Sequence, residues 1–102
     1  MTVRPVNTVA LAGRSVTLQC STNLDGSQAS IAWLRNPPSG DHIVDFDCQP
    51  NPTLPQYTVI NGSDGRCDLV INAASLELAA TYRCYDRGFN KADAELTVIG
   101  ES

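Results

Sequence analysis

The chain has 102 residues, of which 42% are hydrophobic and 18% are charged, and its formal net charge at pH 7 is −4. This length suits one domain, and the apolar content is enough for a packed core and excludes a disordered chain. The Lys and Arg residues are scattered, whereas a nucleic-acid-binding protein carries a basic face. No apolar run approaches the length of a membrane span. We expect one domain over residues 1–102, cut from a longer ectodomain, with no nucleic-acid partner and no direct membrane insertion.

Four cysteines stand at Cys20, Cys48, Cys67 and Cys84, and no two of them have the Cys-x-x-Cys spacing that is typical of zinc sites. The single histidine, His42, is too few to complete a mixed cysteine and histidine site. Two disulfides are therefore the better interpretation. They indicate an oxidising, extracellular compartment.

Asn61 begins an Asn-Gly-Ser triplet, which is an acceptor for N-glycosylation. Such triplets also arise by chance, so this one is a weak signal by itself. It agrees with the compartment that the cysteines indicate, and we predict a glycoprotein with a glycan at Asn61.

Short segments with the alternation of a β-strand follow one another along the chain, separated by turn residues. Residues 3–11 predict an edge strand that Pro5 breaks in two. The other expected strands span residues 16–20, 30–35, 42–48, 56–60, 67–71, 81–86 and 94–99. Residues 61–65 predict a hairpin turn, and only residues 75–80 suit a helical turn. About eight short strands at this spacing predict an all-β sandwich or barrel.

A pattern of four residues runs through these strands. Cys20, Trp33 and Cys84 lie on the second, third and penultimate expected strands, and Tyr82 stands two residues before Cys84. This Cys…Trp…Tyr-x-Cys arrangement resembles the immunoglobulin superfamily over essentially the whole chain. The resemblance implies a two-sheet Greek-key sandwich of the variable (V) or intermediate (I) set. It also implies a Cys20–Cys84 bond between the sheets, Trp33 packed on that bond, and Tyr82 as a tyrosine corner.

The resemblance leaves Cys48 and Cys67 as the remaining cysteines. They are expected to join strand C′, at residues 42–48, to the start of strand E, at residues 67–71. Free or intermolecular thiols are the alternative. Free thiols are a liability outside the cell, which favours the bond. Three prolines within residues 49–55 stand where a full variable domain has its C″ strand. Because proline cannot donate to a strand ladder, C″ is expected to be short or absent.

The chain departs from the family pattern in two places. Variable and intermediate domains often pair an arginine at the start of strand D with an aspartate six residues before the second cysteine. Gln56 and Leu78 stand there in this chain, with Arg66 as a rival for the first position. The last strand also lacks the Phe-Gly-x-Gly bulge of antibody and T-cell-receptor joining segments. Two stretches, ADAELTV at residues 92–98 and LVINAASLELAATYRC at residues 69–84, are similar to adhesion receptors of the nephrin and SynCAM type and to variable-type immune receptors of invertebrate animals.

Few residues favour catalysis or metal binding. Asp45 and Asp47 lie on one face of the strand expected at 42–48, so a calcium site is conceivable. Calcium prefers about six to eight oxygen ligands on a shaped loop, and a solvated strand edge is the better interpretation. No motif places His42 beside a nucleophile. We expect no metal, no cofactor and no enzymatic activity.

Binding to another protein is the expected function. With the core tryptophan and the second cysteine pointing inward, alternation turns Leu34, Arg83 and Tyr85 outward on the neighbouring strands C and F. Phe46 on strand C′ and Phe89 in the F–G loop complete the candidate interface. Leucine, tyrosine and arginine on one face favour an interface hot spot, although scattered surface hydrophobes are normal.

The resemblance implies that this face, called GFCC′ after its strands, binds protein partners, among them a second copy of the chain. We therefore expect an extracellular recognition domain of a cell-surface immune-type or adhesion receptor, in a membrane-anchored ectodomain or a secreted protein. The alternative is a soluble innate-immune binder that holds carbohydrate or microbial surfaces through its loops. Among the loop residues, only Phe89 favours this alternative. A third possibility is a spacer domain, which has no need of an apolar GFCC′ face.

Overall fold

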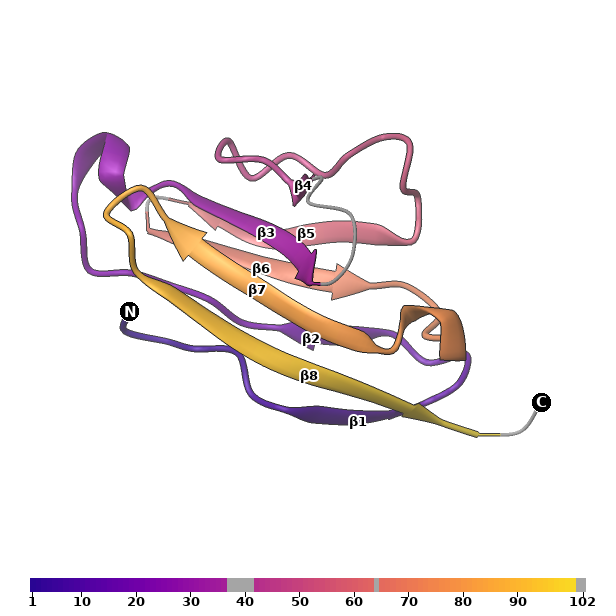
Figure 1. Cartoon of the computed structure of the whole chain (residues 1–102). Coiled ribbons are helices and arrows are strands. Elements are labelled where there is room, and N and C mark those ends of the chain that lie inside the picture. The colour runs from indigo at the N-terminus through magenta and orange to yellow at the C-terminus, as the bar shows by residue number, and fades with distance from the viewer. Residues whose placement is uncertain (37–41, 64, 101–102) are drawn as a thin grey trace.

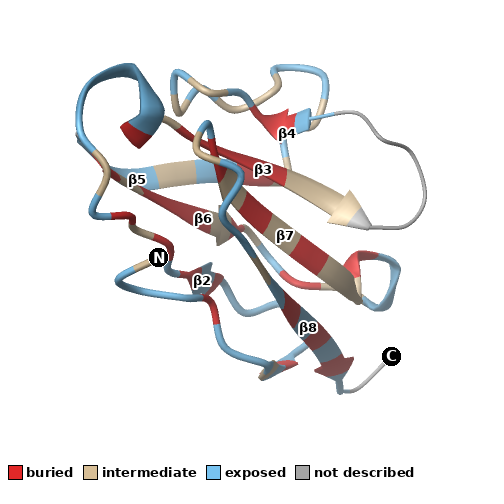
Figure 2. Cartoon of the chain, turned by 60° about the vertical axis from the view of Figure 1, so that its left-hand side comes forward, coloured by how far each residue is buried: buried red, intermediate tan, exposed pale blue. Residues whose placement is uncertain are grey.

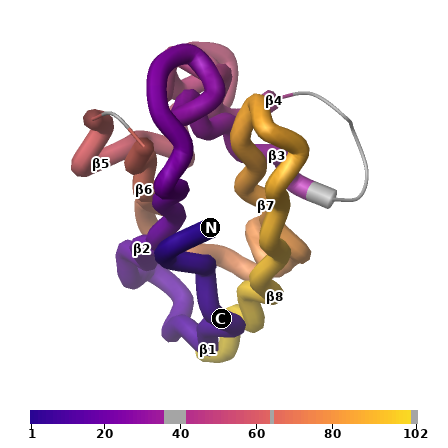
Figure 3. Tube along the Cα trace, turned by 90° about the vertical axis from the view of Figure 1, so that its left-hand side faces the viewer, coloured from indigo at the N-terminus to yellow at the C-terminus, as the bar shows by residue number. Residues whose placement is uncertain are grey.

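The computed structural model describes residues 1–36, 42–63 and 65–100, which fold into two β-sheets packed face to face (Figure 1; Figure 3). Two short 3-10 turns connect strands, η1 (Gly26–Ala29) and η2 (Leu76–Leu78). The strands of the described residues are β1 (Thr8–Leu11), β2 (Val16–Leu18), β3 (Ile31–Asn36), β4 (His42–Val44), β5 (Tyr57–Ser63), β6 (Arg66–Ile71), β7 (Ala80–Asp86) and β8 (Lys91–Ile99).

The larger sheet has the strand order β1-β8-β7-β3-β4 and the smaller sheet has the order β2-β6-β5. Neighbouring strands are antiparallel except β1 and β8, which run parallel. In the strand letters of immunoglobulin domains, β8, β7, β3 and β4 are G, F, C and C′, and β2, β6 and β5 are B, E and D. The two-sheet sandwich predicted from the sequence is confirmed.

The N-terminal segment divides between the two sheets, as the position of Pro5 predicts. Val3 forms a bridge to Ser21 beside the smaller sheet, whereas β1 pairs with β8 in the larger sheet. Pro5 is buried between these two pairings. Because proline has no N–H and a fixed φ, it ends one ladder before the chain crosses to the other.

Side chains alternate between core and solvent along β7 and β8 (Figure 2). In β8, Ala94, Leu96 and Val98 are buried and the residues between them are exposed or half-buried. This period of two follows from the pleat of a strand. The inward side chains of both sheets meet in one core, and the same alternation sends every second residue of β3 and β7 to the outer face of the larger sheet.

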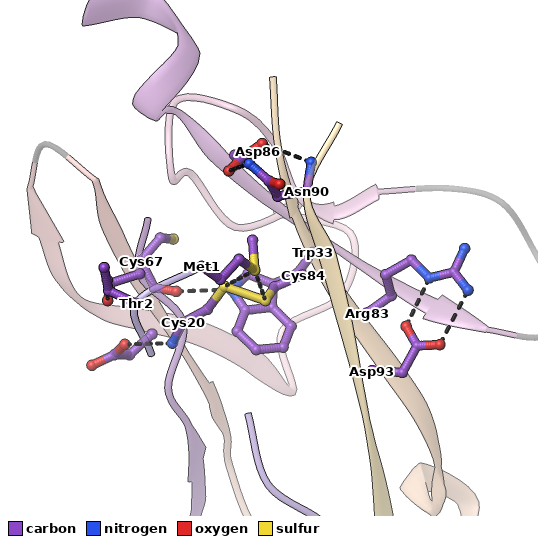
Figure 4. The surroundings of a disulfide bond; sticks show 12 residues. Met1, Thr2, Cys20, Trp33, Cys67, Arg83, Cys84, Asp86, Asn90 and Asp93 are labelled. Carbon is purple, nitrogen blue, oxygen red and sulfur yellow. Dashed lines mark hydrogen bonds and ion pairs between the residues drawn. A yellow bond between two sulfur atoms is a disulfide. The ribbon is translucent and has the colours of Figure 1, made fainter. Parts of the chain in front are cut away.

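Trp33 lies fully buried in this core beside the Cys20–Cys84 disulfide (Figure 4). Its indole Nε1 donates a 2.9 Å hydrogen bond to the carbonyl of Cys67, which belongs to the opposite sheet. The Sδ atom of Met1 lies 3.8 Å from each disulfide sulfur. The centre of the sandwich is therefore held by a covalent bond, a buried ring and one polar contact between the sheets.

A second disulfide joins Cys48, in the turn after β4, to Cys67 in β6. It also links the two sheets, across the proline-rich connection that precedes β5. Among the described residues this connection carries no strand, and its one ladder contact is an isolated bridge between Val44 and Pro50. The C″ strand is thus reduced to a single bridge.

Tyr82 closes the end of the core next to η2. Its hydroxyl donates a 2.6 Å hydrogen bond to the carbonyl of Leu78, and the hydroxyl of Tyr57 lies 3.0 Å away. Burial raises the pKa of Tyr82 far above its usual value, followed in effect by the hydrogen bond with Tyr57. Tyr57 begins β5, next to the position where related domains often carry an arginine. Gln56 precedes Tyr57 and the Leu78 carbonyl binds Tyr82, so the two phenols lie beside the positions of that family ion pair.

Arg66, the rival candidate for that ion pair, pairs instead with Asp68 on its own strand. The Asp68 carboxylate is fully buried and its Oδ2 accepts hydrogen bonds from Arg66 Nε and Nη2 at 3.1 and 2.9 Å and from Asn61 Nδ2 at 2.9 Å. Its Oδ1 accepts the backbone N–H of Cys20 at 3.1 Å. The carboxylate thus satisfies a backbone donor just beyond the end of β2, which a buried chain requires.

The strand predicted at residues 42–48 is wrong in its second half, because β4 ends at Val44. Oδ1 of Asp45 accepts the backbone N–H groups of Asp47 and Gln49 at 2.9 and 3.1 Å, and this local bonding turns the chain. Asp45 and Asp47 therefore do not share the face of a strand, and the geometric basis for a calcium site is lost. The sequence also does not predict η1.

The tyrosine corner can be tested by removing one hydroxyl. We expect Tyr82→Phe to lower the free energy of unfolding by about 1–3 kcal/mol, because the buried Leu78 carbonyl loses its partner. Urea denaturation followed by tryptophan fluorescence measures the difference. Tyr85→Phe, whose hydroxyl lies on the outer face, is the control and should cost less than about 0.5 kcal/mol. Equal losses in both variants would contradict the role of the corner.

The second disulfide can be removed while the first is kept. Cys48→Ala/Cys67→Ala should remain folded through Cys20–Cys84 and lose about 3 kcal/mol of unfolding free energy, the chain-entropy value for a loop of about 20 residues. Circular dichroism and denaturant titration check both statements. A double variant that is unfolded in buffer, or one as stable as the parent, would show that the loop constraint has been misjudged.

Candidate binding face

The outer face of the larger sheet displays the three strand residues that the sequence predicts there. Leu34 and Arg83 are cross-strand partners on β3 and β7, and Tyr85 faces Ala32 one step further along. Ala32 is fully buried although it belongs to the outer face.

Leu34, Arg83 and Tyr85 line a groove with a volume of about 660 Å³. All five side chains of the predicted interface contribute to it, although β4 contributes Phe46 only through the turn that follows. The complete lining is Leu34, Phe46, Arg83, Tyr85, Asp86, Arg87, Phe89 and Lys91.

Phe46 and Tyr85 of the groove belong to an aromatic cluster with His42. The rings of Phe46 and Tyr85 meet edge to face, with centroids 5.1 Å apart and planes at 84°. His42 stacks on Tyr85 at 5.8 Å, and a hydrogen bond joins its Nε2 to the Tyr85 hydroxyl. Burial raises the pKa of Tyr85. The Arg87 guanidinium lies 4.4 Å above the centre of the Phe46 ring, a cation–π contact that holds both side chains.

The turn that carries Phe46 is fixed at both sides. Asp45 binds the backbone N–H groups of the turn, and the carbonyl of Asp45 accepts the N–H of Cys48 at 2.9 Å. Cys48 is in turn bonded to Cys67 in the opposite sheet. The second disulfide therefore anchors the segment that places Phe46 against Tyr85.

The loop between β7 and β8 is organised by Asp86, which is 2% exposed. Its Oδ1 accepts the backbone N–H groups of Gly88 at 2.8 Å and Asn90 at 3.0 Å, and its Oδ2 accepts Asn90 Nδ2 at 3.0 Å (Figure 4). Burial by itself raises the pKa of Asp86. Hydrogen bonds from Asn90, Thr22 and Gly88 outweigh that effect and hold the pKa below its usual value.

Phe89 stands at the tip of this loop, 95% exposed, with φ at +67°. A bulky residue seldom adopts the left-handed region, because its Cβ crowds the backbone. The hydrogen bonds of Asp86 keep the loop in this shape. Unfavourable backbone geometry that the surroundings maintain is typical of functional sites.

The charges around the groove differ in their partners. Arg83 donates two hydrogen bonds to Asp93, at 2.7 and 3.1 Å, which raise the pKa of Arg83 and lower that of Asp93. Neither Arg87 nor Lys91 forms an ion pair within the described ranges of the chain. The groove thus contains one neutralised cation and two that lack a carboxylate partner in the described structure.

The remaining predicted sites lie elsewhere. Asn61, the predicted glycosylation acceptor, is exposed near the end of β5, and its Nδ2 donates to Asp68. The described residues contain no group of three or more His, Cys, Asp or Glu side chains that could hold a metal ion. None of the helical segments described is long and apolar enough to cross a membrane.

Sequence reasoning did not assign four residues of this face: His42, Asp86, Arg87 and Lys91. Asp86 had a local signal, because an aspartate four residues before an asparagine, with glycine between, is typical of a turn in which side chains bind the backbone. The positions of His42 and Lys91 depend on the register of β4 and β8 in the sheet, and that of Arg87 on how the loop after β7 meets the turn after β4. No local pattern indicates either.

The comparisons with known proteins agree with this architecture. A family model described as immunoglobulin domain matches residues 6–87. A chain of the complex between the IG1 domains of Dpr1 and DIP-eta superposes with a TM-score of 0.81 at 18% identity, covering 96% of this chain and 92% of that one. The RIG-5 IG1 homodimer gives 0.79 at 20% identity, with 97% and 94% covered.

The Ig1 domain of mouse SynCAM 2 is also similar, with a TM-score of 0.79, 19% identity and 96% and 95% of the two chains covered. No curated protein sequence matches at a significant level. At such identities the similar solved structures show the fold alone. The family model, in contrast, matches most of the chain. The chain therefore belongs to the immunoglobulin domain family.

Proposed function

We propose that this chain is an extracellular recognition domain of a cell-surface adhesion or immune-type receptor, and that it binds a protein partner through its GFCC′ face. The observation that carries the proposal is the groove in which Leu34, Phe46, Tyr85 and Phe89 come together from two strands and two loops. Aromatic side chains and arginine beside an apolar depression are the composition of an interface hot spot.

The rigidity of the face supports a role in recognition. Phe46 sits on a disulfide-anchored turn and contacts Tyr85 and Arg87, so its side chain does not have to be ordered when a partner arrives. The Asp86 loop holds the backbone of Phe89, whose side chain is exposed. Ordering flexible side chains costs roughly 0.5–1.5 kcal/mol each on association. A face prepared in this way loses less entropy on binding than a flexible one.

The comparisons support protein partners in a general way. Two of the similar solved structures are described as assemblies of first immunoglobulin domains, one as a complex of two different domains and one as a homodimer. A second copy of this chain is therefore one candidate partner. The two disulfides support an extracellular location, because such bonds persist in oxidising compartments.

A soluble binder of carbohydrate or microbial surfaces is the second candidate function. The exposure of Phe89 at a loop tip favours it, since sugars stack on exposed rings. The two functions differ in what they require of the sheet: a loop binder depends on Phe89 and not on Leu34, which lies on β3.

Acid should weaken the loop that presents Phe89. The pKa of Asp86 is lower in the folded state than in the unfolded state, so its stabilising contribution is complete above the unfolded value of about 4 and is lost as the pH falls through the folded value. Asp86→Asn should therefore flatten the decline in unfolding free energy below about pH 4. Denaturant titrations over that range measure the slope.

Asp93→Asn is the comparison variant for this pH dependence. Asp93 also has a lowered pKa, but its ion pair with Arg83 is exposed and screened by solvent, so its effect on the slope should be smaller. An Asp86→Asn protein that keeps the acid sensitivity of the parent would show that Asp86 does not govern the loop.

The proposed face is tested by light scattering at several concentrations. If a second copy is the partner, the non-reduced protein forms a concentration-dependent dimer that Tyr85→Ala and Leu34→Asp abolish. Thr17→Asp, on the exposed face of β2, is the matched control and should leave association intact. A dimer that persists in both face variants would contradict binding through GFCC′.

A protein that stays monomeric throughout excludes a second copy as a partner under these conditions. Biolayer measurements with an immobilised glycan panel then separate the two candidate functions. Glycan binding that Phe89→Ala removes and Leu34→Asp leaves unchanged would favour the loop binder.

A further inference from the structure

The groove of the GFCC′ face has the opposite charge to the domain that carries it. The chain has a formal net charge of −4, yet the charged side chains exposed in the groove are Arg83, Arg87 and Lys91. The one acid in the lining is Asp86, which is buried and accepts hydrogen bonds from its own loop. The groove is therefore locally positive on a domain whose net charge is negative.

Only part of this positive charge is balanced within the described structure. Asp93 receives both hydrogen bonds of the Arg83 guanidinium, so Arg83 offers little to a partner. The guanidinium carbon of Arg87 lies 4.4 Å from the centre of the Phe46 ring, and no carboxylate of the described residues pairs with this guanidinium. Neither Arg87 nor Lys91 forms an ion pair among the described residues, although the charge of Lys91 also acts on Asp93 and lowers its pKa, so Arg87 is the less compensated of the two cations offered to a ligand.

The space between these cations is apolar. Leu34, Phe46, Tyr85 and Phe89 are the apolar side chains of its lining. A groove of about 660 Å³ lined by these side chains accommodates a large apolar side chain. The cations lie at the loop end of the same groove, so the complementary surface has an apolar side chain with acidic groups next to it.

We propose that the groove binds a different protein through a segment in which an apolar side chain is flanked by Asp or Glu carboxylates. The inference rests on the proposed function and deepens it, because it assigns the chemistry of the partner at the same face. The carboxylates pair with Arg87 and Lys91, and the apolar side chain packs against Tyr85 and Phe89.

A second copy of the chain fits this groove poorly. In a symmetric dimer the same patch meets itself, so Arg87 and Lys91 of both copies would share one interface. Like charges across an interface are unfavourable, and the net negative charge of each whole domain adds repulsion during the encounter. A partner with local carboxylates instead gains from the sign of the groove.

The test uses the whole chain and three matched sets of immobilised short peptides. Each set has Leu, Ile, Phe or Val at its centre, flanked by Asp and Glu in the first set, by Lys and Arg in the second, and by Ser and Asn in the third. We expect binding to the acidic set above the other two, and a decrease with added salt. Arg87→Gln/Lys91→Gln should weaken that binding about tenfold, the sum of two exposed ion pairs.

The matched control is Arg4→Gln/Arg14→Gln, which changes the net charge equally at exposed positions outside the groove. It should bind the acidic peptides as the parent does. Equal loss in the two double variants would mean that the overall charge drives binding, and this overturns the inference.

The remaining outcomes separate this inference from the proposed function. Preference for the neutral or basic peptides, with loss in Tyr85→Ala, overturns the acidic partner and leaves the GFCC′ face as the interface. Acidic binding that Tyr85→Ala does not affect overturns both. Binding to no set, together with a dimer that Tyr85→Ala abolishes and Arg87→Gln/Lys91→Gln keeps, identifies a second copy as the occupant and overturns the inference.

Discussion

The structure depends on the contacts of one residue, Cys67. Its sulfur is bonded to Cys48, its carbonyl accepts the indole N–H of Trp33, and its own N–H donates to the carbonyl of Cys20 at 3.1 Å. Cys20 in turn carries the first disulfide, to Cys84. One backbone position of β6 therefore connects the ladder of the smaller sheet, the central ring of the core and both covalent links to the larger sheet.

This arrangement determines what the outer face presents. Trp33 is fixed between the sheets, so Leu34 must point to the other side of β3, and Cys84 fixes Arg83 and Tyr85 on β7 in the same way. Cys48 holds the turn from which Phe46 reaches Tyr85. The face is thus positioned by residues that are not part of it, and a change in the core is expected to reach the groove through β3, β7 and this turn.

The sandwich, the two broken halves of the N-terminal strand and the reduced C″ segment could be predicted because each follows from a local rule. Alternation with a period of two gives the inward and outward residues, and proline cannot donate to a ladder. The end of β4 could not be predicted in this way, because Asp45 is compatible with a strand until its side chain binds Asp47 and Gln49. Arg66 likewise remains ambiguous until Asp68 is known to be buried beside it.

The candidate interface illustrates the same division. Alternation alone puts Leu34, Arg83 and Tyr85 on one face, since all three lie on regular strands. The stacking of Arg87 on Phe46 joins two loops separated by about 40 residues, and only the folded chain brings them together. Composition also cannot reveal that Asp93 forms an ion pair with Arg83, whereas no carboxylate of the described residues pairs with Arg87.

These two arginines show why contacts rather than residue counts determine recognition. Both belong to the β7 side of the groove, yet Asp93 accepts the hydrogen bonds of Arg83, whereas Arg87 contacts the Phe46 ring and pairs with no carboxylate of the described residues. A carboxylate arriving at Arg83 would have to displace Asp93, whereas one arriving at Arg87 would displace no ion pair. Because a partner gains most where no existing contact must be broken, the specificity of the groove is expected to come from Arg87 and not from Arg83.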